Sequence, residues 1–244
     1  MNNRRVQLFI FSVMFVVGLL FYFMGRIHAE EQQTKIGVKE IKTKGSIMVE
    51  KVVAQEYEEG PKKIAITFDD GPHPNYTEQL LDGLKERDVK ATFFVTGEHA
   101  ELHPDIIKRM KEEGHLIGNH TYSHIQLTNS NREKFKAELI KTNEILEEIT
   151  GDEVEYVRPP YGSWDKSFEK ELNMFPVLWS IDPLDWCSSN ASRITDKIVR
   201  KAGENEIILM HDYYATSVTA ALSAIDRLKE DGYTFVTVEE ILFD

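Results

Sequence analysis

From Pro61 onward, short apolar runs alternate with longer segments in which apolar residues recur at helical spacing. No other feature constrains the fold as strongly, because this alternation is typical of βα units that assemble into a largely parallel sheet. The apolar runs expected to be strands are residues 64–68, 91–95, 115–118, 156–158, 177–181, 207–210 and 234–238. Amphipathic segments predict helices at residues 76–86, 105–113, 132–149, 192–201 and 219–229.

The length of this region limits the kind of parallel fold that it can form. It spans 184 residues, from 61 to 244, whereas a complete eight-unit (β/α) barrel takes about 250. We therefore expect an α/β fold, a distorted (β/α) barrel of about seven parallel strands. A flat, doubly wound sheet is the alternative, but neither a Gly-x-Gly-x-x-Gly nor a Gly-x-x-x-x-Gly-Lys motif follows the first expected strand.

The N-terminal sequence differs from the rest in hydropathy. Residues 6–24 are almost entirely apolar and follow Arg4 and Arg5. A helix of this length reaches about 28 Å, close to the roughly 30 Å hydrocarbon core of a bilayer. We expect residues 1–28 to form a transmembrane signal anchor, residues 29–60 a polar stalk, and residues 61–244 a globular domain. The basic flank predicts a single-pass membrane protein with an extracytoplasmic domain, or a secreted protein if the chain is cleaved near Ala29.

The net charge argues against a nucleic-acid partner, and the cysteine count excludes an intrachain disulfide. The formal net charge is −12, and nucleic acids are bound through clustered Lys and Arg. We therefore expect no nucleic-acid partner, whereas a neutral polymer is compatible with this charge. Because Cys187 is the single cysteine, no intrachain disulfide can form and the fold must depend on its core.

Polar residues able to do chemistry follow the expected C-terminal ends of five strands. They are Asp69 and Asp70 after the first strand, His120 and His124 after the third, Arg158 at the end of the fourth, Asp185 after the fifth and His211 after the sixth. The Asp-Asp-Gly-Pro sequence alone would also suit an ordinary turn. Because strand ends converge at one mouth of a parallel barrel, the combination favours an active site there.

His120 and His124 are four residues apart. On one helical turn, this spacing places both imidazoles on the same face, where they can bind one cation. Surface histidines also reach this spacing by chance. A carboxylate from the first strand would complete a His-His-Asp set with one open position, the composition of a catalytic zinc site.

Arg158, Asp182 and Trp186 each also admit a structural interpretation, because Asp182 could cap a turn and Trp186 could belong to the core. Arg158 is either a charged strand end before a stiff Pro-Pro turn or a group that keeps a neighbouring carboxylate ionised. Asp185 beside His211 would raise the pKa of the imidazole and fix its orientation, as suits a general acid. The remaining histidines are interpreted as structural or solvent-exposed: His28, His73, His99, His103 and His115.

Five motifs in chain order carry a resemblance to a known family. They are Thr67-Phe68-Asp69-Asp70-Gly71, His120-Thr121-Tyr122-Ser123-His124, Arg158-Pro159-Pro160-Tyr161-Gly162, Asp182-Pro183-Leu184-Asp185-Trp186 and Leu209-Met210-His211. Over residues 61–244 the chain resembles the polysaccharide deacetylases of the NodB-homology type, carbohydrate esterase family 4. The family's distorted (β/α) barrel agrees with the strands expected above, and residues 61–244 would be the catalytic domain.

The resemblance implies a role for each motif residue. Asp69 would be the general base, with Arg158 tuning it, and His211 would be the general acid, with Asp185 as its partner. The metal would be held by Asp70, His120 and His124. The Tyr161 backbone N–H would face the oxyanion, and the acetyl methyl group would lie in a pocket lined by Trp186 and Leu209.

The activity implied by the resemblance is metal-dependent hydrolysis of N-acetyl groups on an amino-sugar polysaccharide. We expect N-acetylglucosamine of peptidoglycan as the substrate, Zn²⁺ as the divalent metal with Co²⁺, Ni²⁺ or Fe²⁺ as alternatives, and attachment to the membrane through residues 6–24. Chitin oligomers and O-acetylated xylan are alternative substrates of the same centre. A glycan-binding protein without turnover is disfavoured because both a base and an acid are present.

Overall fold

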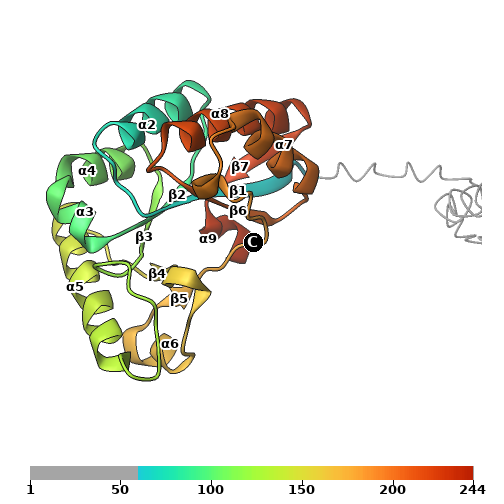
Figure 1. Ribbon diagram of the computed structural model, residues 1–244. Coiled ribbons are helices and arrows are strands. Elements are labelled where there is room, and N and C mark those ends of the chain that lie inside the picture. The colour runs from blue at the N-terminus through green and yellow to red at the C-terminus, as the bar shows by residue number, and fades with distance from the viewer. Residues whose placement is uncertain (1–59, 244) are drawn as a thin grey trace, which may run out of the picture. The chain divides into compact units, whose positions relative to one another are not determined.

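The computed structural model describes residues 60–243 (Figure 1). The expected anchor, and the expected stalk up to residue 59, lie outside the described residues. Within the described part, no helix combines the length and the apolar character that crossing a bilayer requires.

The strands form one parallel, seven-stranded sheet. Its order is β5-β4-β3-β2-β1-β6, and β7 also pairs with β1. The bounds are β1 Lys62–Asp69, β2 Thr92–Val95, β3 Leu116–Asn119, β4 Tyr156–Val157, β5 Phe175–Pro176, β6 Glu206–His211 and β7 Tyr233–Val236. Because β6 pairs with nearly the whole of β1, β7 and β2 must share its other edge, β7 beside residues 62–65 and β2 beside residues 67–69.

The sheet curls until the chain beyond β5 reaches β6. Ile181 forms a parallel bridge with Ile208, and its N–H donates to the carbonyl of Ile207 at 3.1 Å. The parallel strands of the expected barrel are therefore confirmed, but its closure depends on a single bridge. The ladders from β3 through β2 and β1 to β6 have three to six register pairs each, whereas β3 and β4 share one pair and β4 and β5 share two.

The expected strand at residues 177–181 was wrong. The Val177 N–H still bonds to Val157 of β4 at 2.8 Å, yet the Ser180 N–H already bonds to Ile207 of β6 at 3.0 Å. The chain thus changes partners too quickly to form a ladder with either strand. The buried guanidinium of Arg158 fills the gap, because it donates to the carbonyls of Val177 at 3.1 Å and Leu178 at 3.3 Å.

Helices cover the outer face of the sheet. Figure 1 shows α2 and α8 over the central strands, with α3, α4 and α5 continuing this layer and α9 on the opposite side of β1. The bounds are α2 Tyr76–Glu86, α3 Gly97–Leu102, α4 Pro104–Glu112, α5 Arg132–Thr150, α6 Ser167–Leu172, α7 Ala191–Lys201, α8 Ala215–Glu230 and α9 Val238–Phe243, with short 3₁₀ turns η1 Pro160–Gly162 and η2 Asp185–Cys187.

The five predicted helices are present as α2, α4, α5, α7 and α8. The helices α3, α6 and α9 were not predicted. Each has only six residues, and α3 buries only Gly97 and Ala100, which give almost no periodic apolar signal.

Strand β1 is buried on both faces, as expected for the centre of a parallel sheet. Ile64, Ile66 and Phe68 pack in the same cluster as the apolar residues of α2 and α8. Ala65 points the other way and packs with Phe94 and other residues of the barrel interior. Since side chains alternate along a strand, residues 67 and 69 also face this interior.

Candidate active site

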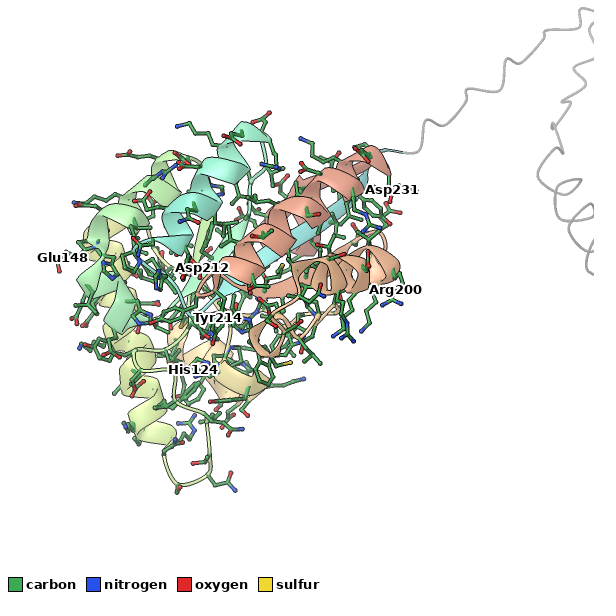
Figure 2. All side chains as sticks on the ribbon, turned by 45° about the horizontal axis from the view of Figure 1, so that its top comes forward. His124, Glu148, Arg200, Asp212, Tyr214 and Asp231 are labelled. Atoms are coloured by element: carbon green, nitrogen blue, oxygen red, sulfur yellow. The ribbon has the colours of Figure 1, made fainter. Side chains whose placement is uncertain are left out.

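The candidate site lies where the strands end. Asp69 and His211 are the last residues of β1 and β6, and their Cα atoms are register partners. Figure 2 labels His124, from the loop after β3, and Asp212 and Tyr214, from the segment between β6 and α8, in this part of the molecule. Sheet register therefore brings together Asp69, the predicted general base, and His211, the predicted general acid.

The Asp69 carboxylate is buried and paired with a buried cation. Its Oδ1 accepts a hydrogen bond from Arg158 at 2.9 Å, and the same guanidinium donates to the Thr67 hydroxyl. Thr67 donates in turn to the Ile208 carbonyl at 2.7 Å. The Arg158 side chain is fully buried and lies 4.2 Å from the centre of the Phe94 ring. The structure thus brings the Arg158 guanidinium into contact with Asp69, as the functional interpretation requires.

Asp70, His120 and His124 come together as one candidate metal cluster among the described residues. Asp70 Oδ1 lies 3.4 Å from Nε2 of His120 and 3.4 Å from Nε2 of His124. His120 Nδ1 is 2.6 Å from the Arg158 carbonyl, which can only accept, so Nδ1 carries the proton. In a neutral His120 ring, Nε2 then presents its lone pair to the carboxylate.

This donor set fits a divalent metal ion. Electron-rich atoms that face one another at 3.4 Å are stabilised by a cation between them, and ligands of four-coordinate zinc lie about 3.3 Å apart. Asp70 Oδ1 is also a buried oxygen without a hydrogen-bond partner in the structure. Burial of Asp70 opposes its ionisation, but when the imidazoles are protonated, the polar contact with His120 and the charges of the nearby imidazoles outweigh burial and lower the pKa of Asp70 to about 2.

The two histidines do not lie on a helix, contrary to the prediction. His120 and His124 flank a loop in which Thr121 has φ 62° and His124 has φ 55°. The loop passes through these left-handed residues, and Nε2 of each imidazole still lies 3.4 Å from Asp70 Oδ1. Asp70 itself has φ 73°, a conformation that costs a non-glycine residue roughly 1–3 kcal/mol.

Asp185 holds His211 through both carboxylate oxygens. Oδ1 lies 2.9 Å from the ring Nδ1, and Oδ2 accepts the backbone N–H of His211 at 2.9 Å. Burial disfavours the imidazolium, but the hydrogen bond and charge of Asp185, with smaller contributions from Asp69 and Asp70, raise the pKa of His211 to about 9. A protonated imidazole at neutral pH can act as an acid.

The residues predicted to surround the substrate are at the same mouth. Tyr161 has φ 59° and is 66% exposed, and its ring centre is 5.0 Å from that of His124. Leu209 pairs in register with Thr67, so it faces the barrel interior below His211. Trp186 is 54% exposed and follows Asp185 in η2. Asp182 accepts the Leu184 N–H at 2.7 Å, which is the turn role that its sequence also suits.

Sequence reasoning missed two polar residues beside the site. Asp212 is buried, with Oδ2 bonded to the Thr77 hydroxyl at 2.5 Å, and burial raises its pKa to about 7. A Cβ added to Gly71 would lie 2.4 Å from this carboxylate, so the turn after Asp70 requires glycine. His99, interpreted above as structural or exposed, binds the Asp70 backbone. The position of Asp212 directly after His211 was the one available signal.

A profile of the family described as polysaccharide deacetylase matches residues 56–177. The chain is 36% identical to peptidoglycan-N-acetylmuramic acid deacetylase PdaC of Bacillus subtilis over 88% of this chain and 46% of PdaC, so it spans about half the length of that relative. It is 38% identical to a peptidoglycan-N-acetylglucosamine deacetylase of Bacillus cereus over 78% of this chain and 92% of that one. The solved structure of B. subtilis PdaC superposes with a TM-score of 0.72 and 40% identity over 75% of this chain and 90% of that chain.

Proposed function

Because the chain belongs to the polysaccharide deacetylase family, we propose that it hydrolyses N-acetyl groups of an amino-sugar polysaccharide and releases acetate. One observation carries the proposal: a carboxylate and an imidazole on paired strand ends, Asp69 and His211, lie beside the candidate metal cluster of Asp70, His120 and His124. A base, an acid and a Lewis-acid site are the groups that amide hydrolysis requires.

Each residue has a defined task in this proposal. A divalent cation held by Asp70, His120 and His124 would supply Lewis-acid chemistry. Asp69 accepts a proton from the attacking water, and the neighbouring Arg158 holds the Asp69 carboxylate in place through a 2.9 Å hydrogen bond.

The other groups stabilise the negative charge that forms during the attack and protonate the leaving group. The Tyr161 backbone N–H donates to the acetyl oxygen as it gains negative charge. His211 gives its proton to the departing amine, a poor leaving group until protonated, and Asp185 stabilises the imidazolium before this transfer. We assign the methyl group of the acetyl substituent to the surface formed by Leu209 and Trp186.

We propose peptidoglycan as the polymer and its N-acetylglucosamine as the sugar. The relatives support peptidoglycan, because PdaC is described as a muramic acid deacetylase and the B. cereus relative as a glucosamine deacetylase of peptidoglycan. Zn²⁺ is our proposed metal, since two imidazoles and one carboxylate are typical ligands of catalytic zinc.

We further propose that residues 6–24 anchor the chain with its catalytic domain, residues 61–244, outside the membrane. The apolar length of residues 6–24 supports an anchor, and a peptidoglycan substrate would also lie on that side. Protease treatment of intact cells tests this: the domain should be digested without lysis. Protection of the domain would contradict the proposal, and mass spectrometry of the mature chain would reveal cleavage near Ala29.

The activity is tested by measuring acetate released by the purified, Zn²⁺-loaded full-length chain. Peptidoglycan, chitin oligomers and acetylated xylan are supplied in parallel, with the chelator-treated protein as control. We expect the largest release from peptidoglycan, with glucosamine rather than muramic acid in the hydrolysed product. Faster release from acetylated xylan would identify an esterase. Binding of glycan without acetate from any polymer would contradict the proposal in favour of a binding protein.

A further inference from the structure

The short helix α3 contacts the backbone of the loop that carries the two histidines of the metal cluster. The Gly97 N–H donates to the Thr121 carbonyl at 3.0 Å, and the Glu98 N–H donates to the Tyr122 carbonyl at 3.0 Å. Both acceptors lie between His120 and His124 in the chain. The first amides of α3 therefore hold the middle of the histidine loop.

The same helix contacts the loop that carries the third member of the cluster. His99 Nδ1 lies 2.7 Å from the Asp70 carbonyl oxygen, and because this oxygen can only accept, Nδ1 must donate. The neighbouring Thr96 N–H donates to the Gly71 carbonyl at 3.2 Å. The segment from Thr96 to His99 thus links the two loops that bring carboxylate and imidazoles together.

The start of α3 and the His99 ring are closely packed. A Cβ on Gly97 would lie 2.6 Å from the Thr142 hydroxyl of α5 and 2.6 Å from the Tyr122 ring, so the start of α3 is already in close contact on both sides. The His99 ring stacks on Tyr213, with ring centres 5.5 Å apart and an interplanar angle of 26°. The imidazole therefore has a fixed orientation as well as a fixed position.

Asp70 needs such an external contact. Its φ of 73° is a left-handed conformation that persists only when surrounding groups enforce it. The His99 bond fixes the direction of the Asp70 carbonyl group, which is attached to the same Cα atom as the side chain that reaches His120 and His124. Without the bond, the Asp70 turn can relax while the histidine loop stays in place.

We propose that His99 is a positioning residue of the metal centre: its imidazole donates to the Asp70 backbone and sets the separation between Asp70 and the two histidine ligands. The inference rests on the metal centre of the proposed function, and extends it to a residue outside the ligand set. Groups that orient metal ligands typically change metal affinity by about 10–100-fold when removed.

Metal affinity tests the inference independently of turnover. We measure Zn²⁺ dissociation constants by competition with a chromophoric chelator, and the visible absorption of the Co²⁺-loaded full-length protein. His99→Phe and His99→Leu remove the donor, and His99→Asn keeps an N–H group near the position of Nδ1. His103→Phe is the matched control, because His103 follows the same helix and its side chain is not part of the contact with Asp70.

We expect Zn²⁺ affinity to fall by about 10–100-fold in His99→Phe and His99→Leu, with an altered Co²⁺ spectrum and an unchanged unfolding midpoint of the metal-free protein. His99→Asn should bind within about threefold of wild type, and His103→Phe should match wild type. Wild-type affinity in both donor-free variants, or equal loss in His99→Asn, would overturn the inference. If His99→Phe does not fold, His99→Leu and His99→Asn still decide it.

Failure of the proposed function gives a different result. A wild-type protein that binds Zn²⁺ but releases no acetate contradicts the deacetylase proposal and leaves the effect of His99 on affinity measurable. A protein that releases acetate, with Zn²⁺ affinity unchanged by His99→Phe, contradicts only the role of His99. A wild-type protein with no Zn²⁺ or Co²⁺ affinity overturns both.

Discussion

The two halves of the candidate site are positioned by different parts of the fold. Asp69 and His211 end two paired strands, and the ladder between β1 and β6 fixes their separation. Asp70, His120 and His124 lie beyond strand ends, and two of them have positive φ, 73° for Asp70 and 55° for His124. The proposed proton-transfer groups are thus held by the sheet, and the proposed metal ligands by loops.

The two halves of the site are therefore stabilised by different contacts. The strand pair is stabilised by the same ladder and core contacts that stabilise the fold, so its geometry is as robust as the sheet. The ligand loops adopt costly backbone conformations and need extra contacts, such as those from α3 and from the Arg158 carbonyl to His120. Variants of the two halves should therefore fail in different ways.

The largest effect is expected from removal of the Asp70 carboxylate, which lies on the loop after β1. Asp70→Ala leaves two imidazoles without an anionic ligand, so metal affinity should fall more than the roughly 100-fold upper limit for groups that only orient ligands. Acetate release should be lost with it. Metal content after dialysis and acetate release are the measurements. Asp182→Ala, which removes a carboxylate bonded to a turn N–H, should keep both, and metal retention in Asp70→Ala would contradict the assignment.

Substitution of Asp69, the carboxylate at the end of β1, should separate the loss of catalysis from the loss of metal binding. Asp69→Asn removes the base while the ligands stay in place, so acetate release should fall about 10²–10⁴-fold. Bound metal should remain equimolar with protein, as measured by elemental analysis. A parallel loss of metal and activity would show that Asp69 belongs to the ligand half, and the comparison between the halves would then fail.

The same division explains how much could be predicted from the sequence. Asp69 and His211 follow apolar runs, and parallel strands place the residues after such runs at one mouth, so their proximity was predictable. Sequence motifs also indicated His120 and His124, but not the non-helical loop between them, because left-handed residues such as Thr121 leave no periodic signal. The contact from His99 to Asp70 was missed because it joins a side chain to a backbone carbonyl 29 residues away.

Arg158 contacts both halves of the site, because its side chain bonds to Asp69 and its carbonyl accepts from His120. Its removal should therefore lower the stability of the fold as well as the activity. Arg158→Ala leaves Asp69 unpaired in the interior and deprives the Val177 and Leu178 carbonyls of their donor. Breaking a buried ion pair in this way costs about 3–5 kcal/mol of unfolding free energy. Urea unfolding measures this loss, and Arg158→Lys should lose less because the charge is kept.

Arg132 is the matched control for this prediction. It also contacts an aromatic ring and several carboxylates, but it lies at the surface, with its side chain 31% exposed. Because solvent screens exposed ion pairs, Arg132→Ala should destabilise the fold much less than Arg158→Ala. Equal destabilisation by the two substitutions would refute the interior role of Arg158.

The smallest expected effect concerns His211, the proposed general acid at the end of β6. The pKa of His211 is raised to about 9, so the acid form persists through neutral pH, and acetate release should decline only as the pH rises through about 9. In Asp185→Asn the pKa of His211 should fall toward its ordinary value near 6.5. The alkaline limb of the kcat/KM profile should shift to lower pH, and activity at pH 8 should drop by roughly 30-fold.

Stability should follow the same pKa. Because the folded pKa of His211 lies above the unfolded value, its contribution is complete below about pH 6.5 and disappears as the pH rises through about 9. Asp185→Asn should remove this part of the pH dependence of unfolding, while metal content stays unchanged because Asp185 contacts no ligand of the cluster. An unshifted alkaline limb in this variant would mean that groups other than Asp185 set the protonation of His211.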